Sequence, residues 1–348
     1  MLRIRPDSDS SLSSSNHYAC DEVSLFSDQL AFQTKVADPD RTPLAAGKLS
    51  MPASIGNPMT RVLTFAVIVA ACFCMAQGQV SNDAQLLETG TPTKPQKLVQ
   101  VTKDNSIVTY NIRWRTGDEL KTISDWILEK RPAVIALQEV DRSKQRTNKA
   151  NNARALAEQL GMNYAWAAPP LPKSGKDKEE ETGVELLSSS PLRDVTRIVL
   201  PHAGPGGRWR VALGATIKIN NAEVRVYSVH AETRIPLDQK IDQYRAVLDD
   251  LKRFPKPMPT IVMGDFNSWE PATVKAVRKL FTSEDFTTPF ADDDNTFKRN
   301  AVVFDLELKL DWMWLRGLQA TNSGIDRSIT VSDHFPLWAV ALCQNPER

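Results

Sequence analysis

Cysteine is scarce in this chain, which has four among 348 residues. Three of them, Cys20, Cys72 and Cys74, precede residue 79. A domain that begins after residue 79 keeps only Cys343, so it cannot form an intrachain disulfide. Such a domain must be stabilised by the burial of apolar side chains, and a hydrophobic content of 41% is sufficient for a large core.

A strong net charge is also missing. The chain has 43 basic and 42 acidic residues, and its formal net charge at pH 7 is +1. A protein dedicated to binding duplex nucleic acid usually carries a large positive charge. The composition therefore gives no electrostatic indication of such a protein, although it leaves room for a local basic patch.

Long apolar runs are rare, and the most prominent one extends from Val62 to Met75. Arg61 precedes it and Ala76-Gln77-Gly78 follows, which matches the positive, apolar and small-residue parts of a secretory signal. The run is short for crossing a bilayer. We therefore predict a signal peptide over residues 59–78 and a secreted or periplasmic protein with no integral membrane domain.

Other interpretations of this run remain open. It also suits a buried core segment or a membrane anchor. Val69-Ala70-Ala71-Cys72 resembles a bacterial lipobox, which would leave the protein lipid-anchored at Cys72.

Residues 1–58 are Ser-rich, charged and aperiodic. Such a segment buries too little apolar surface to offset the entropy lost on ordering. We predict that it is disordered or is a mis-annotated extension. Because a secretory signal belongs at an N-terminus, translation is expected to start at Met51 or Met59.

The remaining chain divides into a polar linker at 79–104 and one domain at 105–343, in which strand and helix patterns alternate. Residues 169–183 contain prolines, glycines and a charged run and are expected to form a surface loop. Expected strands lie at 107–111, 133–140, 184–187, 211–219, 224–230, 260–264, 310–315 and 337–342, and expected helices at 120–131, 153–160, 241–251 and 271–280.

Four short polar strings follow β-type apolar segments or lie near the C-terminal strand. They are Tyr110-Asn111, Leu137-Gln138-Glu139, Gly264-Asp265-Phe266-Asn267 and Ser332-Asp333-His334. Strands deliver the side chains at their ends to one edge of a sheet. Each string alone is weak, but the ordered set predicts an active site.

Together these strings resemble the endonuclease/exonuclease/phosphatase superfamily, the deoxyribonuclease I-like fold, over essentially all of residues 105–343. The resemblance implies an α/β fold: a four-layer α/β/β/α sandwich of two packed mixed β-sheets flanked by helices. It also implies hydrolysis of a phosphate ester with a divalent metal, usually Mg²⁺, with Mn²⁺ or Ca²⁺ as further possibilities.

The resemblance assigns metal binding to two carboxylates. Glu139 matches the family's metal-ligating glutamate, and Asp333 is expected to be a second carboxylate near the metal. Asn111 would orient ligands or the substrate phosphate. Hard cations prefer carboxylate oxygens, although a strand-end glutamate is more often a solvated or paired surface group.

Asp265 and Asn267 stand two residues apart at a strand end, so they share one face. In the family the aspartate aligns or deprotonates the attacking water, and the asparagine donates to a phosphate oxygen. A plain turn is the alternative, because Gly, Asp and Asn all favour turns.

Two histidines complete the set. His334 resembles the histidine that contacts the scissile phosphate, and Asp311 matches its orienting carboxylate. His230 matches a second phosphate-contacting histidine, although a histidine at a strand end is more often structural. Arg210 is a further candidate for holding a phosphate oxygen.

These roles imply in-line attack of water on phosphorus, with a phosphodiester substrate. We expect a monomeric, nuclease-leaning phosphodiesterase acting on nucleic acid; a phospholipid headgroup, as in a sphingomyelinase-like enzyme, is the alternative. A non-catalytic module that binds phosphorylated ligands is a hypothesis of another class. A carbohydrate-active acid pair is the remaining rival, but it has no need of the histidines.

Overall fold

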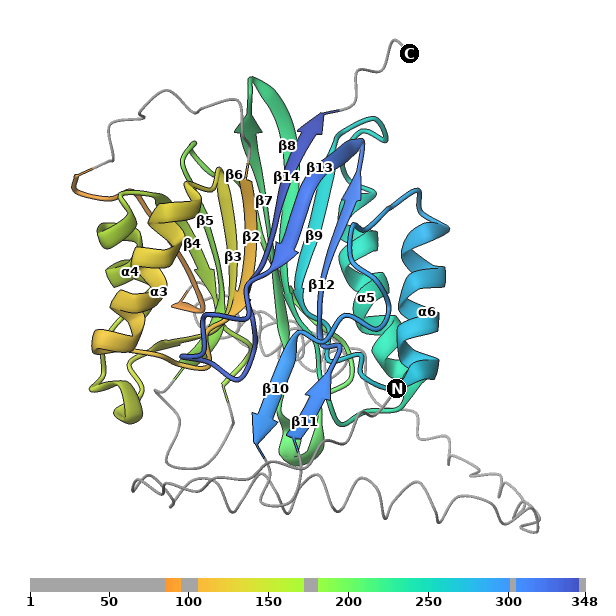
Figure 1. Ribbon diagram of the computed structural model, residues 1–348, viewed down its shortest axis with the longest axis horizontal. Helices are drawn as coiled ribbons and strands as arrows, with labels where there is room; N and C mark the ends of the chain where they lie inside the picture. Colours follow the sequence, from red (N-terminus) through yellow and green to blue (C-terminus); the bar gives the residue numbers. More distant parts are fainter. Residues whose placement is uncertain (1–84, 95–105, 172–180, 301–304, 344–348) are drawn as a thin grey trace, which may run out of the picture. The chain divides into compact units, whose positions relative to one another are not determined.

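Two β-sheets lie face to face at the centre of the domain, and two helices cover the outer face of each sheet (Figure 1). This computed structural model describes residues 85–94, 106–171, 181–300 and 305–343. The predicted four-layer α/β/β/α sandwich is therefore confirmed, and both sheets are mixed because β2–β3 and β8–β9 are parallel pairs.

The first sheet has seven strands in the order β1-β4-β5-β3-β2-β14-β13, and the second has five in the order β12-β9-β8-β7-β6. A separate two-stranded ribbon, β10-β11, extends at the lower edge in Figure 1. The strand bounds are β1 Leu87–Gly90, β2 Ser106–Asn111, β3 Val134–Arg142, β4 Asn163–Ala167, β5 Glu181–Ser188, β6 Arg193–Val199, β7 Val211–Ile219, β8 Ala222–His230, β9 Thr260–Asp265, β10 Phe297–Asn300, β11 Asp305–Leu308, β12 Asp311–Arg316, β13 Leu318–Ile325 and β14 Leu337–Cys343.

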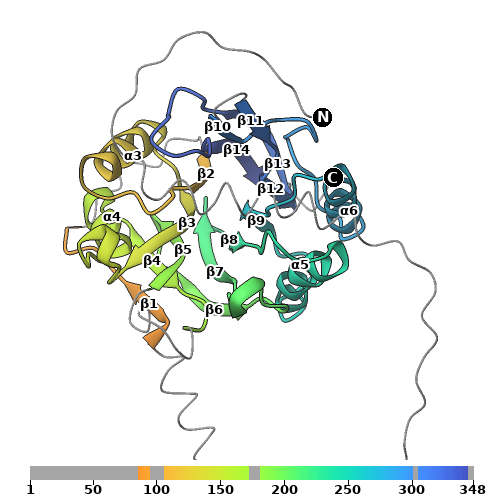
Figure 2. The ribbon, with the colours of Figure 1, turned by 90° about the horizontal axis from the view of Figure 1, so that it is seen from below.

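Helices α3 (Gly117–Lys130) and α4 (Asn152–Leu160) cover the seven-stranded sheet, and α5 (Leu237–Leu251) and α6 (Pro271–Thr282) cover the five-stranded sheet (Figures 1 and 2). Two short 3₁₀ helices lie at Gln145–Thr147 and Pro205–Gly207. As predicted, α4 ends at Gly161, which adopts the left-handed conformation of a C-terminal cap. At its other end the side chain of Asn151 accepts a hydrogen bond from the backbone of Arg154.

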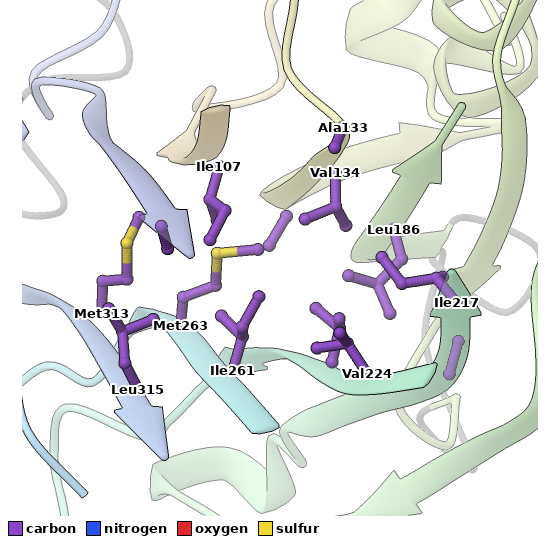
Figure 3. Packing of buried hydrophobic residues seen from close by; sticks show 14 of the residues in the cluster. Ile107, Ala133, Val134, Leu186, Ile217, Val224, Ile261, Met263, Met313 and Leu315 are labelled. Carbon is purple, nitrogen blue, oxygen red and sulfur yellow. The ribbon is translucent and has the colours of Figure 1, made fainter. Parts of the chain in front are cut away.

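The alternation of side chains along each strand fills three apolar cores. Val134 and Ala136 of β3 face the five-stranded sheet, where they join Ile261 and Met313 in the core between the sheets (Figure 3). Leu137, on the opposite face of β3, packs with residues of α3 and α4. A third core lies between the five-stranded sheet and α5 and α6. Helical and strand periodicity predicted many of the individual elements, whereas the family resemblance predicted their arrangement in layers.

The sheets are larger than the sequence predicted. Strands β4, β6, β10, β11 and β13 are additional to the expected ones, and β1 lies within the predicted linker. β1 pairs with β4, and the carboxylate of Glu88 in β1 lies 2.9 Å from a guanidinium nitrogen of Arg142 and 3.0 Å from one of Arg154. Residues 87–90 thus form the edge of the seven-stranded sheet.

Several predictions concern residues outside those that the structure describes. They include the extension at 1–58, the signal peptide at 59–78, the lipid anchor at Cys72 and most of the linker. In the predicted surface loop, residues 172–180 also lie outside the described residues. Across the described ranges no helix is long and apolar enough to span a membrane, and Cys343 is a free, partly buried cysteine.

Candidate active site

Strand register brings three predicted residues together at one end of the five-stranded sheet. Asp265 is the last residue of β9, and it is aligned with His230 at the end of β8 and with Asp311 at the start of β12. Neighbouring residues in register lie side by side on the same face. Gly264 allows this close approach, because a Cβ there would be 2.1 Å from the carbonyl oxygen of Val229 and its φ is +141°.

The seven-stranded sheet contributes Asn111 and Glu139 from neighbouring strands. Asn111 ends β2 opposite Gln138 of β3, and the register of β3 then skips Glu139 in a β-bulge. Glu139 has a φ of 56°, in the left-handed region. A bulge redirects a side chain that would otherwise alternate with its neighbours. It turns the partly exposed Glu139 towards Asn111, whose amide nitrogen lies 3.3 Å from Glu139 Oε1.

Asp265 is the centre of the assembled site. The amide nitrogen of Asn111 donates to its Oδ2 at 3.0 Å, and the backbone N–H of Asn267 donates to its Oδ1 at 2.9 Å. The Nε2 atoms of His230 and His334 approach Oδ2 at 3.7 and 3.8 Å. The structure therefore brings residues from both sheets and from the C-terminal segment around one carboxylate.

The charges of Asp265 and His334 depend on each other. Burial raises the pKa of Asp265 to about 7, against the opposing effect of the His334 cation. Burial disfavours the charged form of His334, but Asp311 and Asp265 outweigh it and raise the pKa of His334 to about 10. Since Nδ1 of His334 lies 2.9 Å from Asp311, its Nε2–H is directed towards the site as a donor.

His230 differs from His334 in its charge. Burial, reinforced by the positive charges of Arg210 and Arg208, lowers the pKa of His230 well below its ordinary value. A guanidinium nitrogen of Arg210 lies 3.3 Å from Nδ1 of His230. Because guanidinium groups only donate, Nδ1 accepts this hydrogen bond and Nε2 carries the proton of the neutral ring. The site thus pairs a neutral histidine with a charged one.

Arg210 is held in place by a carboxylate that the sequence did not single out. Nε of Arg210 lies 3.2 Å from Glu232, which also binds Arg208. Burial opposes ionisation of Glu232, but Arg210 and Arg208 outweigh it and lower its pKa to about 2. Glu232 therefore remains charged and keeps Arg210 against His230.

The side chain of Asn267 is engaged by the protein itself. Its Nδ2 donates to the carbonyl oxygen of Ala231 at 2.9 Å, and the backbone carbonyl oxygen of Asn267 accepts from the buried Lys240 at 3.3 Å. These bonds fix the loop that follows Asp265. The expected donation from Asn267 to a phosphate oxygen stays a prediction.

Asp333 makes different contacts from those of the central carboxylates. Its Oδ2 lies 3.1 Å from a guanidinium nitrogen of Arg113 and 3.1 Å from one of Arg299. Two arginines thus neutralise Asp333, and its expected role as a metal ligand stays a prediction.

The donor set fits a divalent cation. In the part of the chain that the structure describes, Asp265, Asp311 and His334 form a group whose ligand atoms lie within 4.8 Å of one another. A cation bound there could leave the hydrogen bond between Asp311 and Nδ1 of His334 in place, but it would have to displace the proton on Nε2 of His334. The carboxylate of Glu139 is more accessible, and carboxylate oxygens suit Mg²⁺, Mn²⁺ and Ca²⁺. The structure thus offers both the triad and the predicted ligand Glu139.

Sequence analysis did not identify Trp114, although it lies only three residues after Asn111. Its indole N–H donates to Oε2 of Glu139 at 2.6 Å. Arg113 and Arg299, which bind Asp333, were also not singled out. Their contacts with Asp333, like the contact of Trp114 with Glu139, are visible only in three dimensions.

Comparison with known proteins supports the fold and identifies the family. Residues 108–334 match the model of the Endonuclease/Exonuclease/phosphatase family, and no curated protein matches the chain. A family protein from Leptotrichia buccalis C-1013-b is 20% identical with a TM-score of 0.55 and covers 68% of this chain and 99% of its own. The human Nocturnin catalytic domain with bound sulfate is 17% identical with a TM-score of 0.55, covering 74% and 97%. A functionally unknown conserved protein from Enterococcus faecalis V583 is 21% identical with a TM-score of 0.52, covering 69% and 100%.

At these identities the solved structures establish the fold alone, whereas the family match extends over most of the domain and includes the residues from Asn111 to His334. Members of the family are phosphoric ester hydrolases that depend on a divalent metal. The chain belongs to the endonuclease/exonuclease/phosphatase family.

Proposed function

We propose that the protein is an exported, divalent-metal-dependent phosphodiesterase that hydrolyses nucleic acid by in-line attack of water. The observation that carries this proposal is the environment of Asp265. It is a buried carboxylate between two hydrogen-bond donors, with a charged histidine on one side and a neutral histidine on the other. This arrangement suits a base beside a site of developing negative charge.

The residues divide the chemistry between them. Asp265 accepts a proton from the attacking water as the new P–O bond forms and the ester P–O bond breaks. The Nε2–H groups of His334 and His230 donate to the phosphoryl oxygens as negative charge increases, and the leaving oxygen takes a proton from solvent. A bound divalent cation would add electrostatic stabilisation of the same oxygens, and Glu139 is its proposed carboxylate ligand.

The preference for nucleic acid is supported by the arginines around the site. Arg113 and Arg299 have side chains that are 27% and 24% exposed, and both lie beside Asp333. Partly exposed guanidinium groups bind the successive phosphates of a polynucleotide. A sphingomyelin headgroup presents one phosphate and a cation, which these arginines would repel.

The test is hydrolysis of plasmid DNA, RNA, sphingomyelin and bis(p-nitrophenyl) phosphate, each with and without EDTA. We expect cleavage of nucleic acid and of the small diester, loss of activity in EDTA, and recovery with excess Mg²⁺. Activity confined to sphingomyelin would overturn the substrate preference, and activity that survives EDTA would overturn the metal dependence. Failure on all four substrates would favour the phosphate-binding module.

Export is part of the proposal and is supported by the apolar run at residues 62–75. N-terminal sequencing of the protein from culture medium or periplasm should show a mature end near Gly78. A mature protein that begins at Met1 would contradict export, and a lipid-modified Cys72 would establish anchoring instead.

A further inference from the structure

We propose that Trp114, supported by Arg146 and Asp141, is a positioning residue that holds the carboxylate of Glu139 in the orientation required for cation binding. The inference rests on the proposed function, because it assumes that Glu139 is a metal ligand.

Both oxygens of Glu139 are held by donors from one segment. Asn111 approaches Oε1 at 3.3 Å, and the indole N–H of Trp114 donates to Oε2 at 2.6 Å. The backbone N–H of Trp114 also donates to the carbonyl oxygen of Glu139 at 2.9 Å. Trp114 therefore fixes both the main chain and the side chain of Glu139.

The backbone around Trp114 is unusual. Arg113 and Trp114 have φ values of 45° and 54°, a left-handed conformation that residues with a Cβ seldom adopt. Glu139, at the bulge of β3, has a φ of 56°. Two strained segments thus meet through the bonds between Trp114 and Glu139. Such strain persists where surrounding contacts require it, and it is common at functional sites.

The guanidinium group of Arg146 stacks on one face of the Trp114 indole ring and holds the ring in place. The guanidinium carbon lies 4.1 Å from the centroid of Trp114, within range of a stacked cation–π contact. The same guanidinium makes two hydrogen bonds to the buried carboxylate of Asp141, at 2.7 and 2.8 Å. The hydroxyl of Thr182 donates to Asp141 at 2.6 Å. A contiguous chain of contacts therefore leads from Thr182 through Asp141, Arg146 and Trp114 to Glu139.

This chain of contacts is needed to orient the Glu139 carboxylate, because packing alone does not confine that side chain. Its side chain is 23% exposed, so without the indole its carboxylate would keep only the longer contact with Asn111. Ordering a glutamate side chain costs conformational entropy, and a site ordered in advance binds its ligand more tightly. Residues that orient metal ligands typically contribute 10–100-fold to metal affinity.

The test compares two tryptophans that each donate to a carboxylate. Trp114→Phe keeps the ring under Arg146 and removes the N–H. Trp126→Phe removes the bond from Trp126 to Asp326, 2.8 Å long, in a different part of the domain. We would titrate the full protein with Mn²⁺ alone and measure binding by calorimetry. The dissociation constant for Mn²⁺ should be about tenfold higher for Trp114→Phe than for the wild type. Trp126→Phe should bind Mn²⁺ as the wild type does.

A second pair of measurements separates positioning from general damage. Raising Mg²⁺ should restore kcat of Trp114→Phe to near the wild-type value, while the Mg²⁺ concentration for half-maximal activity stays raised. Arg146→Ala should weaken Mn²⁺ binding in the wild type but add little to Trp114→Phe, because the two residues act on Glu139 in sequence.

The outcomes distinguish this inference from the proposed function. Equal Mn²⁺ affinity in Trp114→Phe, Trp126→Phe and the wild type would overturn the inference and leave the hydrolase proposal standing. Additive losses in the double variant would overturn the role of Arg146. A wild-type protein that binds no Mn²⁺ would overturn the metal-dependent function itself, and the inference with it.

Discussion

Asp265 and Glu185 are both buried acids on central strands, but their surroundings are opposite. Asp265, 2% exposed, receives two hydrogen bonds and faces two histidines. Glu185 is fully buried in β5, and neither of its carboxyl oxygens has a hydrogen-bond partner among the described residues. Burial raises the pKa of Glu185 well above its ordinary value, and the negative charge of Glu88 adds to this.

The difference shows what makes a buried acid useful. Burial alone favours the protonated, neutral carboxyl, which can neither accept a proton nor bind a cation. Around Asp265 the donors and the His334 cation oppose that effect and hold the pKa at about 7. A candidate catalytic acid is therefore recognised by its compensating partners and not by burial.

The largest expected effect comes from replacing each acid by its amide. Asp265→Asn should lower the turnover of bis(p-nitrophenyl) phosphate roughly a thousandfold, because it removes the proposed base. Glu185→Gln should leave turnover within about twofold, since a protonated carboxyl and an amide are both neutral. Steady-state kinetics of the two variants measure the contrast. Equal losses in both would show that burial, and not the partners, matters.

The pH dependence of the rate sharpens the same contrast. Activity should fall by up to about tenfold per pH unit as Asp265 takes up a proton below pH of about 7, and should fall again near pH 10 as His334 loses its proton. Saturating Mg²⁺ will move the acid limb to lower pH, because a cation favours the carboxylate. The profile of Glu185→Gln should match that of the wild type. A flat profile between pH 5 and 9 would contradict the assignment of Asp265.

Glu185→Leu should have the smallest effect on activity. It should, however, change how the free energy of unfolding depends on pH. The folded-state pKa of Glu185 lies above its unfolded value, so folding takes up a proton and its contribution to stability decreases as pH rises from about 4. As pH rises above about 4 the wild type should lose stability relative to Glu185→Leu, at most about 1.4 kcal/mol per pH unit. Urea unfolding at several pH values measures this. Parallel stability curves for the two proteins would show that Glu185 finds a partner when it ionises.

Much of the site follows from the sequence because it depends on strand ends. His230, Asp265 and Asp311 lie at the ends of short apolar β-type segments, and the family resemblance assigned them to one site. The partners of these residues were not. Trp114, Glu232 and Arg299 reach the site through a left-handed loop, an ion pair and the β10–β11 ribbon, none of which has a local sequence signature.

The missed strands have a related explanation. β6 reads Arg-Asp-Val-Thr-Arg-Ile-Val, and β13 reads Leu-Gln-Ala-Thr-Asn-Ser-Gly-Ile. Both lie at an edge of their sheets, where one side of the strand meets solvent and polar residues are tolerated. Their weak alternation therefore reflects their position, which only the completed sheet reveals.

The pairing of β1 with β4 determines where the folded unit can be shortened. A chain truncated to begin at residue 105 would leave β4 as an open edge, available for pairing with another molecule. It would also remove the carboxylate of Glu88, with which Arg142 and Arg154 form ion pairs. Recombinant production of the enzyme should therefore retain β1, with the chain beginning at or before residue 85.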